Sequence, residues 1–354
     1  MKTAMIAAAA PFAGGSALAQ PTDKKLGVAL CGLGSLSTYQ IAPALKKTKH
    51  CKLAGIVTGD PEKAKKWQKQ YGLPDRSVYS YDTMDRMADN PDIDIVYVVT
   101  PNALHLEHAT KSALAGKHVF CEKPMEISVE RCQQMIDVCK KAGRVLGVAY
   151  RCQFEPHHLE CMRIARSKEL GTIKFIEGVF GFPLGDQDQW RVKKDLAGGG
   201  ALMDVGIYVL QATRYLTGEE PVRVFATETK TDPVKFKEVD ETMAWTAIFP
   251  SGVVAYCATT FNAAPVGRFR AHTDRGWFGL DPAFNYNGLR GARSDGKSLK
   301  FGEIDQFANE LDEFALSILQ NKPTKVSGEE GLQDVKILSA IYESARTGRA
   351  VDIA

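Results

Sequence analysis

Asp204 and Tyr208 stand four residues apart in the segment DLAGGGALMDVGIYVLQATRYL, which covers residues 195–216. The spacing of its apolar residues predicts an amphipathic helix, and side chains at positions i and i+4 of a helix share one face. A phenol with its ordinary pKa of about 10 is a poor base at neutral pH unless a neighbouring ammonium stabilises the phenolate. Glycines at 198–200 would let the backbone approach a bound molecule. The segment therefore predicts an acid–base site, with a half-buried tyrosine and an aspartate at a helix N-terminus as the alternative.

Lys123 is the candidate for that ammonium, because it stands in the triplet Glu122-Lys123-Pro124 directly after the apolar segment HVFC. A strand interior would reject both a lysine and a proline, so the triplet marks the end of a buried strand. An X-Pro bond can be cis, and we predict a cis bond before Pro124 that directs Lys123 into a cleft. Other polar residues end two further predicted strands: Thr100, Pro101, Asn102 and His105 after one, and Tyr150 and Arg151 after the other.

Short apolar segments and helical segments alternate from Lys25 to about Tyr150. Strands are predicted in LGVALC, CKLAGIV, DIVYVV, HVFC and RVLGVA, with helices between them. This alternation predicts an α/β fold, a doubly wound parallel Rossmann domain over residues 20–150. Ligands bind outside the carboxyl ends of the strands in such sheets, so we expect the polar residues named above to meet around a ligand at that edge.

The first predicted strand runs into Gly32-Leu33-Gly34-Ser35-Leu36, and a helix follows. One glycine permits the tight turn, the second lets the backbone approach a pyrophosphate, and the helix N-terminus supplies N–H donors. The third position of this dinucleotide-binding pattern is Ser37, a small residue outside the consensus. Residues 32–36 are therefore predicted to bind a dinucleotide.

Thr58 and Gly59 end the second predicted strand, where NAD-dependent enzymes place an acid that binds the ribose hydroxyls. An acid would repel a 2′-phosphate, whereas a hydroxyl, a bare backbone and the nearby Lys63 would accept one. We therefore expect NADP. Asp60 comes too late for the ribose and, since Pro61 follows it, is expected to cap a helix. The alternative for Lys63 is an ordinary solvated helix lysine.

The pattern changes after Tyr150. The segments KFIEGVFGF, VRVFATETKT, ETMAWTAIF and GVVAYCATTF predict strands of an antiparallel sheet with one face open to solvent or to a partner. Residues 305–320 and 328–347 predict two closing helices. We expect residues 151–354 to form an α+β domain with a large, open, mostly antiparallel sheet that binds substrate and forms a homo-oligomer, with a dimer favoured. Val254, Tyr256 and Phe261 are its apolar candidates for self-association.

Composition excludes several classes of protein. The formal net charge is only +3 and the basic residues are scattered, so no nucleic-acid partner is expected. No internal apolar run reaches the roughly 18 residues of a membrane helix, so no membrane association is expected. The eight cysteines form no CxxC pair and no cluster with histidines, which predicts buried free thiols and no metal site.

Residues 1–19 have the outline of a secretory signal peptide: a lysine, a short Ala-rich apolar run, and ALA before a polar residue. We therefore expect a periplasmic protein. If the segment is instead an Ala/Gly-rich extension or an arm that packs on another subunit, the protein is expected to be cytoplasmic.

Several motifs together resemble one family. GLG after the first strand, TPNxxH, EKP, YR and WRxxxxLAGGGxLxDxGxY are similar to motifs of the Gfo/Idh/MocA oxidoreductases, in particular their glucose-fructose oxidoreductase branch. The resemblance implies that Lys123, Asp204 and Tyr208 are catalytic, with tyrosine where many members have histidine. It also implies that Ser35 replaces a phosphate-binding lysine. The residues that it implies near the cofactor or the sugar are Thr58, Gly59, Lys63, Tyr81, Pro101, Asn102, Glu122, Arg151, Trp190 and Arg191.

The activity that this resemblance implies is that of an NADP-dependent aldose oxidoreductase with tightly bound NADP(H). One aldose would be oxidised at C1 to a lactone and a second sugar reduced to an alditol, with Tyr208 and Lys123 as the acid–base pair. The polar segment LGDQDQWR, residues 184–191, would bind sugar hydroxyls, with Asp186 beside Lys123, Arg151, Asp204 and Tyr208 as contacts, and with His105 as a further positioner. Alternatives are a sugar dehydrogenase with dissociable NADP, a redox-assisted glycosidase, and a non-enzymatic NADP-binding regulator of the same fold.

Overall fold

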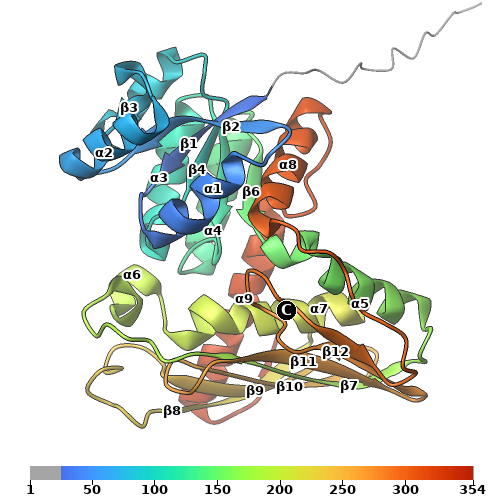
Figure 1. The fold of residues 1–354 in the computed structure, drawn as a ribbon. Helices are drawn as coiled ribbons and strands as arrows, with labels where there is room; N and C mark the ends of the chain where they lie inside the picture. Colours follow the sequence, from blue (N-terminus) through green and yellow to red (C-terminus); the bar gives the residue numbers. More distant parts are fainter. Residues whose placement is uncertain (1–24, 354) are drawn as a thin grey trace, which may run out of the picture.

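The structure is a computed structural model that describes residues 25–353. The predicted signal peptide, residues 1–19, lies outside the described residues. Figure 1 shows two layers: an N-terminal domain, coloured blue to green, stands above a large sheet formed by the later part of the chain.

The N-terminal domain is built on a parallel sheet of six strands in the order β3-β2-β1-β4-β5-β6. The strands are β1 (Leu26–Cys31), β2 (Cys51–Val57), β3 (Val78–Tyr79), β4 (Ile95–Val98), β5 (His118–Glu122) and β6 (Leu146–Ala149). Every residue of β1 and β4 is buried, as helices on both faces of a parallel sheet require. The predicted Rossmann fold is confirmed; the two-residue β3 is too short to carry a periodic signal.

Four helices flank this sheet: α1 (Ala42–Leu45), α2 (Pro61–Tyr71), α3 (His105–Leu114) and α4 (Val129–Lys141). Local signals set their ends. Ser128 caps α4 by accepting a hydrogen bond from the Arg131 backbone N–H (3.3 Å), and Gly72 ends α2 with a left-handed φ of 64°. Short 3₁₀ turns at 75–77 and 81–89 lead into and out of β3.

The second sheet has eight strands in the order β13-β12-β11-β7-β10-β9-β8-β14. The strands are β7 (Ile173–Gly181), β8 (Arg223–Thr229), β9 (Thr242–Ile248), β10 (Val254–Thr260), β11 (Val266–Thr273), β12 (Gly276–Leu280), β13 (Gly291–Arg293) and β14 (Val351–Asp352). Every neighbouring pair is antiparallel except β7 and β10, which run parallel. The mostly antiparallel sheet predicted from the alternating segments is confirmed, and β11 to β14 extend it at both edges.

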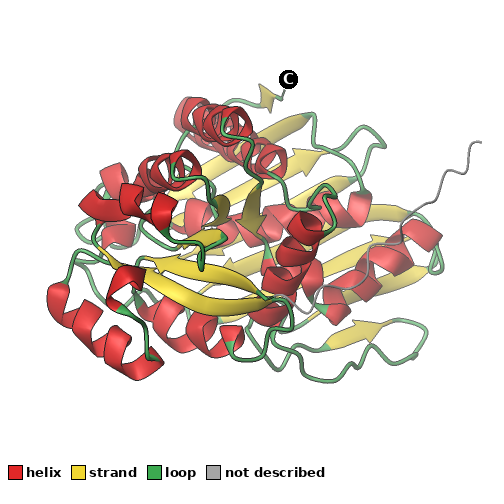
Figure 2. Ribbon diagram, turned by 90° about the horizontal axis from the view of Figure 1, so that it is seen from above, coloured by secondary structure: helices red, strands yellow, loops and turns green. Residues whose placement is uncertain are grey.

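Helices α5 (Pro156–Ser167), α7 (Ile207–Thr217) and α9 (Gly328–Thr347) cover one face of the large sheet, as Figures 1 and 2 show. Within residues 25–353 the opposite face carries no helix, and Phe225 and Tyr256 on it are 46% and 53% exposed. Val254 is partly exposed there. Phe261, the third residue predicted for this face, is fully buried. That prediction is wrong, because side chains alternate along β10 and its odd-numbered residues point to the helix-covered face.

Helix α8 (Gln306–Leu319) returns to the N-terminal domain, where Figure 1 shows it beside the first sheet. Phe314 stacks on Phe120 of β5 with ring centroids 4.6 Å apart. Asp312 accepts a hydrogen bond from the backbone N–H of His50 (2.7 Å). Both predicted closing helices are confirmed, and α8 joins the N-terminal layer although it lies late in the sequence.

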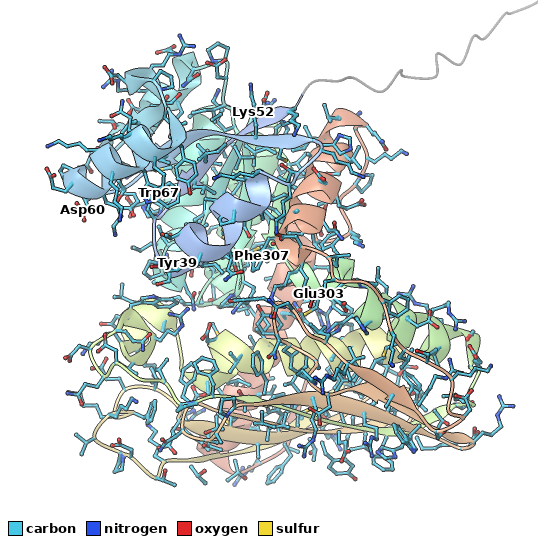
Figure 3. The ribbon with its side chains drawn as sticks, viewed as in Figure 1. Tyr39, Lys52, Asp60, Trp67, Glu303 and Phe307 are labelled. Atoms are coloured by element: carbon cyan, nitrogen blue, oxygen red, sulfur yellow. The ribbon has the colours of Figure 1, made fainter. Side chains whose placement is uncertain are left out.

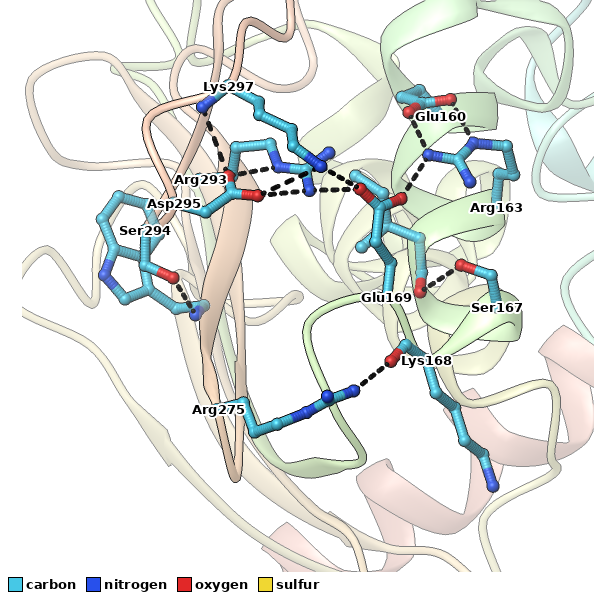
Figure 4. A network of polar contacts seen from close by, with 12 residues as sticks. Glu160, Arg163, Ser167, Lys168, Glu169, Arg275, Arg293, Ser294, Asp295 and Lys297 are labelled. Carbon is cyan, nitrogen blue, oxygen red and sulfur yellow. Dashed lines mark hydrogen bonds and ion pairs between the residues drawn. The ribbon is translucent and has the colours of Figure 1, made fainter.

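A polar network ties one edge of the large sheet to α5 (Figure 4). Arg293 of β13 donates to one oxygen of Glu169 (2.6 Å), and Arg163 of α5 donates to the other oxygen (2.7 Å). Lys297 donates to the first oxygen as well (3.1 Å). Single exposed ion pairs contribute little, but one shared carboxylate here links three separate segments.

The described helices include none that is both long and apolar enough to cross a lipid bilayer. All eight cysteines are free and buried, which confirms the predicted burial of these thiols.

Candidate active site

Lys123 reaches from the end of β5 toward the second domain. The Lys123–Pro124 peptide bond is cis, as predicted, and the preceding Glu122 is buried. The Lys123 Nζ donates to the main-chain oxygen of Asp204 (2.7 Å) and to its Oδ1 (3.1 Å). Only 11% of the lysine side chain is exposed. The two domains therefore meet at an ion pair between predicted site residues.

Asp204 is shared between two cations. Its Oδ1 accepts from Lys123, and its Oδ2 accepts from the Nε of Arg191 (2.9 Å). Burial alone would raise the pKa of this carboxyl, but the charges of Lys123 and Arg191 outweigh burial and lower it to about 2. Asp204 is therefore ionised at neutral pH and holds the lysine in place.

Tyr208 lies beside the same lysine, which stands 4.8 Å from the centroid of its ring. The phenol oxygen accepts a hydrogen bond from the Nε of Arg151 (3.2 Å). Lys123 is adjacent to the phenol, where Asp204 holds its ammonium over the ring, and Arg151 is a second cation at the hydroxyl. Burial raises the pKa of Tyr208, and Arg151 offsets only part of that rise, so the phenol is protonated here at neutral pH.

Arg151 is held by the protein on every side. Its guanidinium lies between the rings of Tyr208 and Tyr286, 4.7 and 4.8 Å from their centroids. Its Nη1 donates to the Oε1 of Gln306 (2.6 Å), and its Nη2 donates to the main-chain oxygen of Phe284 (2.5 Å). The expected direct contacts of Arg151 with cofactor and sugar are therefore replaced by bonds within the protein, which fix the guanidinium beside Tyr208.

Tyr286 and Gln306 are site residues that the sequence does not reveal. Tyr286 is 44% exposed and packs edge-on against Phe307, labelled in Figure 3, with centroids 5.2 Å apart. The Nε2 of Gln306 donates to the main-chain oxygens of Asn285 (3.1 Å) and Tyr286 (2.9 Å). Tyr286 stands in an irregular segment without periodicity, and a polar residue in the first turn of a helix, such as Gln306, is ordinary. Neither position carried a sequence signal.

The helix that carries Asp204 and Tyr208 is not the single regular helix predicted. Helix α6 (Lys194–Ala197) ends at Gly198, which has a left-handed φ of 77°, and a π-helical turn (Leu202–Gly206) precedes α7. Both side chains still contact Lys123. Such π-helical turns are frequent at functional sites, because the extra residue re-aims the side chains around it.

The glycines at 198–200 face protein atoms, so the expectation that they make room for a ligand is wrong. A Cβ on Gly199 would lie 2.0 Å from the Tyr342 hydroxyl oxygen, and one on Gly200 would lie 1.9 Å from the Asp240 main-chain oxygen. The Asp240 carboxylate accepts from the backbone N–H groups of Gly200 (2.6 Å) and Leu202 (2.7 Å). The glycines therefore permit the close packing that anchors the start of this helical segment.

The glycine turn after β1 fits a dinucleotide. Gly32 has a left-handed φ of 98°, and a Cβ there would lie 2.9 Å from the main-chain oxygen of Val99. A Cβ on Gly34 would meet no protein atom within 4 Å, so this backbone faces open space. Ser35 is exposed beside it. The Oγ of Ser37 donates to the main-chain oxygen of Gly32 (2.5 Å), which explains a serine at the third position.

Leu33 and Leu36 contribute backbone rather than side chain to this turn, because Leu33 is buried and Leu36 packs against the core. Donors for a pyrophosphate must therefore come from main-chain N–H groups, which is how glycine turns at helix N-termini bind phosphate.

The end of β2 offers room for the adenosine phosphate. Asp60, labelled at the tip of α2 in Figure 3, accepts from the backbone N–H groups of Glu62 (3.0 Å) and Lys63 (3.1 Å), which confirms the predicted cap. The Lys63 side chain is exposed and forms no ion pair within residues 25–353. The ring of Tyr81 lies 3.2 Å from the position of a Gly59 Cβ. Thr58 comes directly before Gly59, and the exposed Lys63 ammonium nearby is available to bind a phosphate.

Three predicted ligand contacts are used inside the protein instead. His105 is fully buried, with its Nε2 2.8 Å from the main-chain oxygen of Thr100 and its Nδ1 3.1 Å from that of Pro124. The Nδ2 of Asn102 donates to the main-chain oxygen of Ala197 (2.8 Å) and so joins the two domains. Thr100 is itself buried. Main-chain oxygens are the partners of His105 and Asn102, and the hydroxyl oxygen of Thr100 lies 3.0 Å from the Nδ1 of His108, so these groups are bonded within the protein at the edge of the sheet. The partly exposed Pro101 lies among them.

The segment 184–191 reaches the site only at its end. Asp186 is exposed, and its Oδ1 accepts from the backbone N–H of Asp188 (2.8 Å), so it shapes a turn outside the lysine cluster. Arg191 lies 4.5 Å above the ring of Trp190 and binds Asp204. Arg191, with Trp190 against it, therefore contacts the lysine–aspartate–tyrosine cluster, whereas the bond of Asp186 is within its own turn.

A dinucleotide-binding turn and a lysine–aspartate–tyrosine cluster at the carboxyl edge of a Rossmann sheet define an oxidoreductase. No group of three or more histidine, cysteine, aspartate or glutamate side chains in the described chain could hold a metal ion.

The chain belongs to the GFO/IDH/MocA oxidoreductase family. Residues 26–150 match the family model described as "Oxidoreductase family, NAD-binding Rossmann fold", residues 158–279 match the GFO/IDH/MocA C-terminal domain, and residues 292–353 match the oxidoreductase C-terminal alpha/beta domain. The family predicted from the motifs is confirmed.

Relatives of known activity cover nearly the whole chain. D-xylose 1-dehydrogenase [NADP(+)] of Haloarcula marismortui is 32% identical over 93% of this chain and 94% of its own length. D-xylose 1-dehydrogenase (NADP(+)) 2 of Haloferax volcanii is 30% identical over 92% and 98%. The crystal structure of aldose-aldose oxidoreductase from Caulobacter crescentus, complexed with glycerol, is 43% identical with a TM-score of 0.89, over 93% of this chain and all of that chain.

Proposed function

We propose that the protein is an NADP-dependent aldose oxidoreductase that keeps its cofactor bound and uses it for two sugars in turn. One aldose is oxidised at C1 to its lactone, and a second sugar is then reduced to an alditol. The single observation that carries this proposal is the cluster in which Asp204 holds Lys123 beside Tyr208, at the edge where a Rossmann sheet binds a dinucleotide. The names of the relatives, which act on D-xylose and on aldoses, support sugars as the substrate class.

The residues that would hold NADP lie along the carboxyl edge of the first sheet. The open backbone at Gly34 would bind the pyrophosphate, and Thr58 with the exposed Lys63 would bind the 2′-phosphate. The bound cofactor supplies a hydride acceptor for one sugar and a hydride donor for the next. Because a serine cannot neutralise a phosphate, Ser35 adds no charge that would tighten the retention of NADP.

Tyr208 is the group proposed to handle the proton of the sugar hydroxyl. Once the phenol has released its own proton to solvent, its phenolate takes up the proton of the C1 hydroxyl during oxidation. The phenol formed in this way returns that proton to the carbonyl oxygen during reduction. Burial raises its pKa, so the phenol alone is a weak base; the Arg151 guanidinium at its oxygen and the Lys123 ammonium at its ring favour the phenolate as the proton moves. Asp204 holds Lys123 in place.

The sugar would lie beside Tyr286, Trp190 and Arg191. Exposed aromatic rings stack on the apolar faces of pyranoses, and Tyr286 presents such a ring 4.8 Å from the Arg151 guanidinium. An aromatic ring and a fixed cation beside Tyr208 support the proposal that the sugar binds there.

A sugar dehydrogenase that exchanges soluble NADP is the second candidate. Its support is the similarity to two NADP-dependent D-xylose dehydrogenases over more than nine-tenths of the chain. The same site residues would act in both candidates, so they differ in cofactor retention and not in the chemistry at the sugar.

The test of the site is Tyr208→Phe. We expect the rate of aldose-dependent cofactor reduction to fall by about 10²- to 10⁴-fold, because the proton acceptor is lost, while NADP binding stays. Tyr256→Phe is the matched control, since Tyr256 lies on the helix-free face of the large sheet and should keep full activity. Equal rates for both variants would contradict the role of Tyr208, and a variant that loses NADP as well would point to a structural role.

A homodimer and a periplasmic location complete the proposal. The helix-free face with Phe225 and Tyr256 supports self-association. The signal-like residues 1–19 support export, and a periplasmic enzyme without a supply of free NADP would need to retain its cofactor. Fractionation of the native host, with the protein detected by antibody, distinguishes periplasm from cytoplasm.

A further inference from the structure

Two buried carboxyl groups, Glu122 and Glu310, meet at one tyrosine. Glu122 ends β5, Glu310 lies on α8, and both are buried, Glu310 completely. The hydroxyl oxygen of Tyr97, on β4, is 2.7 Å from the Oε1 of Glu122 and 3.3 Å from the Oε1 of Glu310. This cluster lies outside the lysine–aspartate–tyrosine chemistry described above.

Counting hydrogens shows that two ionised carboxylates do not fit. The Tyr97 hydroxyl has one hydrogen, and a carboxylate only accepts. If the hydrogen serves Glu122 at the shorter distance, the contact with Glu310 brings oxygen lone pairs together unless Glu310 carries a proton of its own. A protonated Glu310 donates to Tyr97 and Tyr97 donates to Glu122, so each hydrogen is used once.

The surroundings decide which of the two carboxyl groups is neutral. The Oε2 of Glu122 accepts from the backbone N–H of Lys123 (3.3 Å). Burial raises the pKa of Glu122, and the charges of Lys123 and Arg151 oppose that rise. The Oε2 of Glu310 is buried without a hydrogen-bond partner among the described residues, so an ionised oxygen there would be buried without a donor. Glu310 is therefore the acid and Glu122 the anion.

The titratable groups around Glu310 also favour its neutral form over that of Glu122. Burial raises the pKa of Glu310, the Glu122 charge raises it further, and Arg151 from the turn after β6 opposes the rise. Cys152 from the same turn adds to it. Burial also raises the pKa of Tyr97, so the hydroxyl keeps its hydrogen.

We infer that Glu310 is a positioning residue that holds one proton and, through Tyr97, keeps a single negative charge on Glu122 beside Lys123. The structure thus adds two residues, on β4 and α8, to the machinery at the end of β5. The proton assignment stands by itself, whereas its importance in turnover rests on the proposed function. Loss of the Glu310 proton at high pH would place a second negative charge next to Glu122 and disturb the balance with Lys123 and Arg151.

Infrared difference spectroscopy of the purified protein at neutral pH tests the proton assignment without any sugar. We expect Glu310→Gln, which keeps the shape of the neutral acid, to remove one carboxylic acid C=O band, while the control Glu313→Gln, on the exposed face of α8, removes none. Tyr97→Phe should shift the same band, because the acid loses its acceptor. A band unaffected by Glu310→Gln and by Tyr97→Phe overturns the inference.

The pH dependence of turnover tests the positioning role. Because an amide cannot ionise, Glu310→Gln should move the alkaline limb of the rate profile to higher pH, and Glu313→Gln should leave it in place. An unmoved limb in an active Glu310→Gln variant overturns the role of Glu310 in turnover. A protein that shows the infrared change but no sugar-dependent reaction overturns the proposed function and leaves the proton assignment intact.

Discussion

Asp204 shows how one residue sets the charge of the whole site. Its two oxygens bind cations that come from different segments, Lys123 at 3.1 Å and Arg191 at 2.9 Å. Removing one partner of a buried ion pair is costly, because the other charges stay buried without compensation. The carboxylate therefore matters for stability as well as for the position of Lys123.

The pH dependence of stability should reveal this pair. The pKa of Asp204 falls from 3.8 to about 2 in the folded protein, so its contribution is present above about pH 4 and is lost as pH falls toward about 2. We expect Asp204→Asn to lower the midpoint of thermal unfolding at pH 7 and the difference from wild type to shrink below about pH 4. Calorimetry of both proteins across this range checks the prediction; a constant difference would contradict it.

The types of the reactive residues could be predicted, but their partners could not. Lys123 and Tyr208 carry local signals: a lysine before proline at a strand end and a phenol one turn after an acid. The cation at the Tyr208 hydroxyl depends on Arg151, which is held by Gln306 and by the main chain at 284, both more than 130 residues later. The sequence predicted a ligand contact for His105, but a histidine at a strand end can equally bind the surrounding main-chain oxygens, as His105 does here.

The segment from α6 to α7 is the element on which the site depends most. Asp240 accepts hydrogen bonds from its backbone at Gly200 and Leu202, and Tyr342 of α9 donates to the same carboxylate (2.6 Å). The place of Asp204 and Tyr208 is therefore set by contacts with a loop and with the last long helix.

A pair of glycine variants separates this structural role from cofactor binding. Gly200→Ala would place a Cβ 1.9 Å from the Asp240 main-chain oxygen, and we expect it to lower the free energy of unfolding by at least about 2 kcal/mol. Gly34→Ala meets no protein atom within 4 Å, so it should fold normally but bind NADP more weakly. Urea unfolding and NADP titration measure the two effects. A destabilised Gly34→Ala, or an unaffected Gly200→Ala, would contradict the account.

The presence of helices and strands could be predicted from the sequence more readily than the irregularities within them. Apolar runs, alternating segments and helical periods predicted β1, β2 and β4 to β6 of the first sheet, β7 to β10 of the second, and the two closing helices. The π-helical turn at Leu202–Gly206 and the break at Gly198 could not be predicted, because they depend on the packing of Asp240 and Tyr342. The return of α8 to the first sheet likewise depends on contacts such as Phe314 with Phe120.

At the scale of the whole molecule, the helix-free face of the large sheet exposes aromatic side chains that a partner could cover. Phe225 and Tyr256 border a depression on this face, together with Trp245 and Arg268. Phe175 is a further exposed aromatic residue, 39% exposed, and its ring lies edge-on to that of Tyr256 with centroids 6.2 Å apart. A second copy of this chain would cover these rings.

Charge on this face should separate the proposed dimer. We expect Tyr256→Glu to shift the mass measured by light scattering after gel filtration from dimer to monomer, because two like charges would meet across a symmetric interface. Lys174→Glu, at the outer end of β7, is the control for a change of charge alone. A wild-type protein that is monomeric at all concentrations would contradict the proposal.

The most direct test of the central claim is the absorbance of extensively dialysed protein before and after addition of an aldose. We expect the near-ultraviolet band of reduced nicotinamide to appear without added NADP, in an amount equal to the protein, and to disappear when a second, reducible sugar follows. A spectrum that changes only after NADP is added would contradict the retained, internally recycled cofactor and favour the dehydrogenase with dissociable NADP.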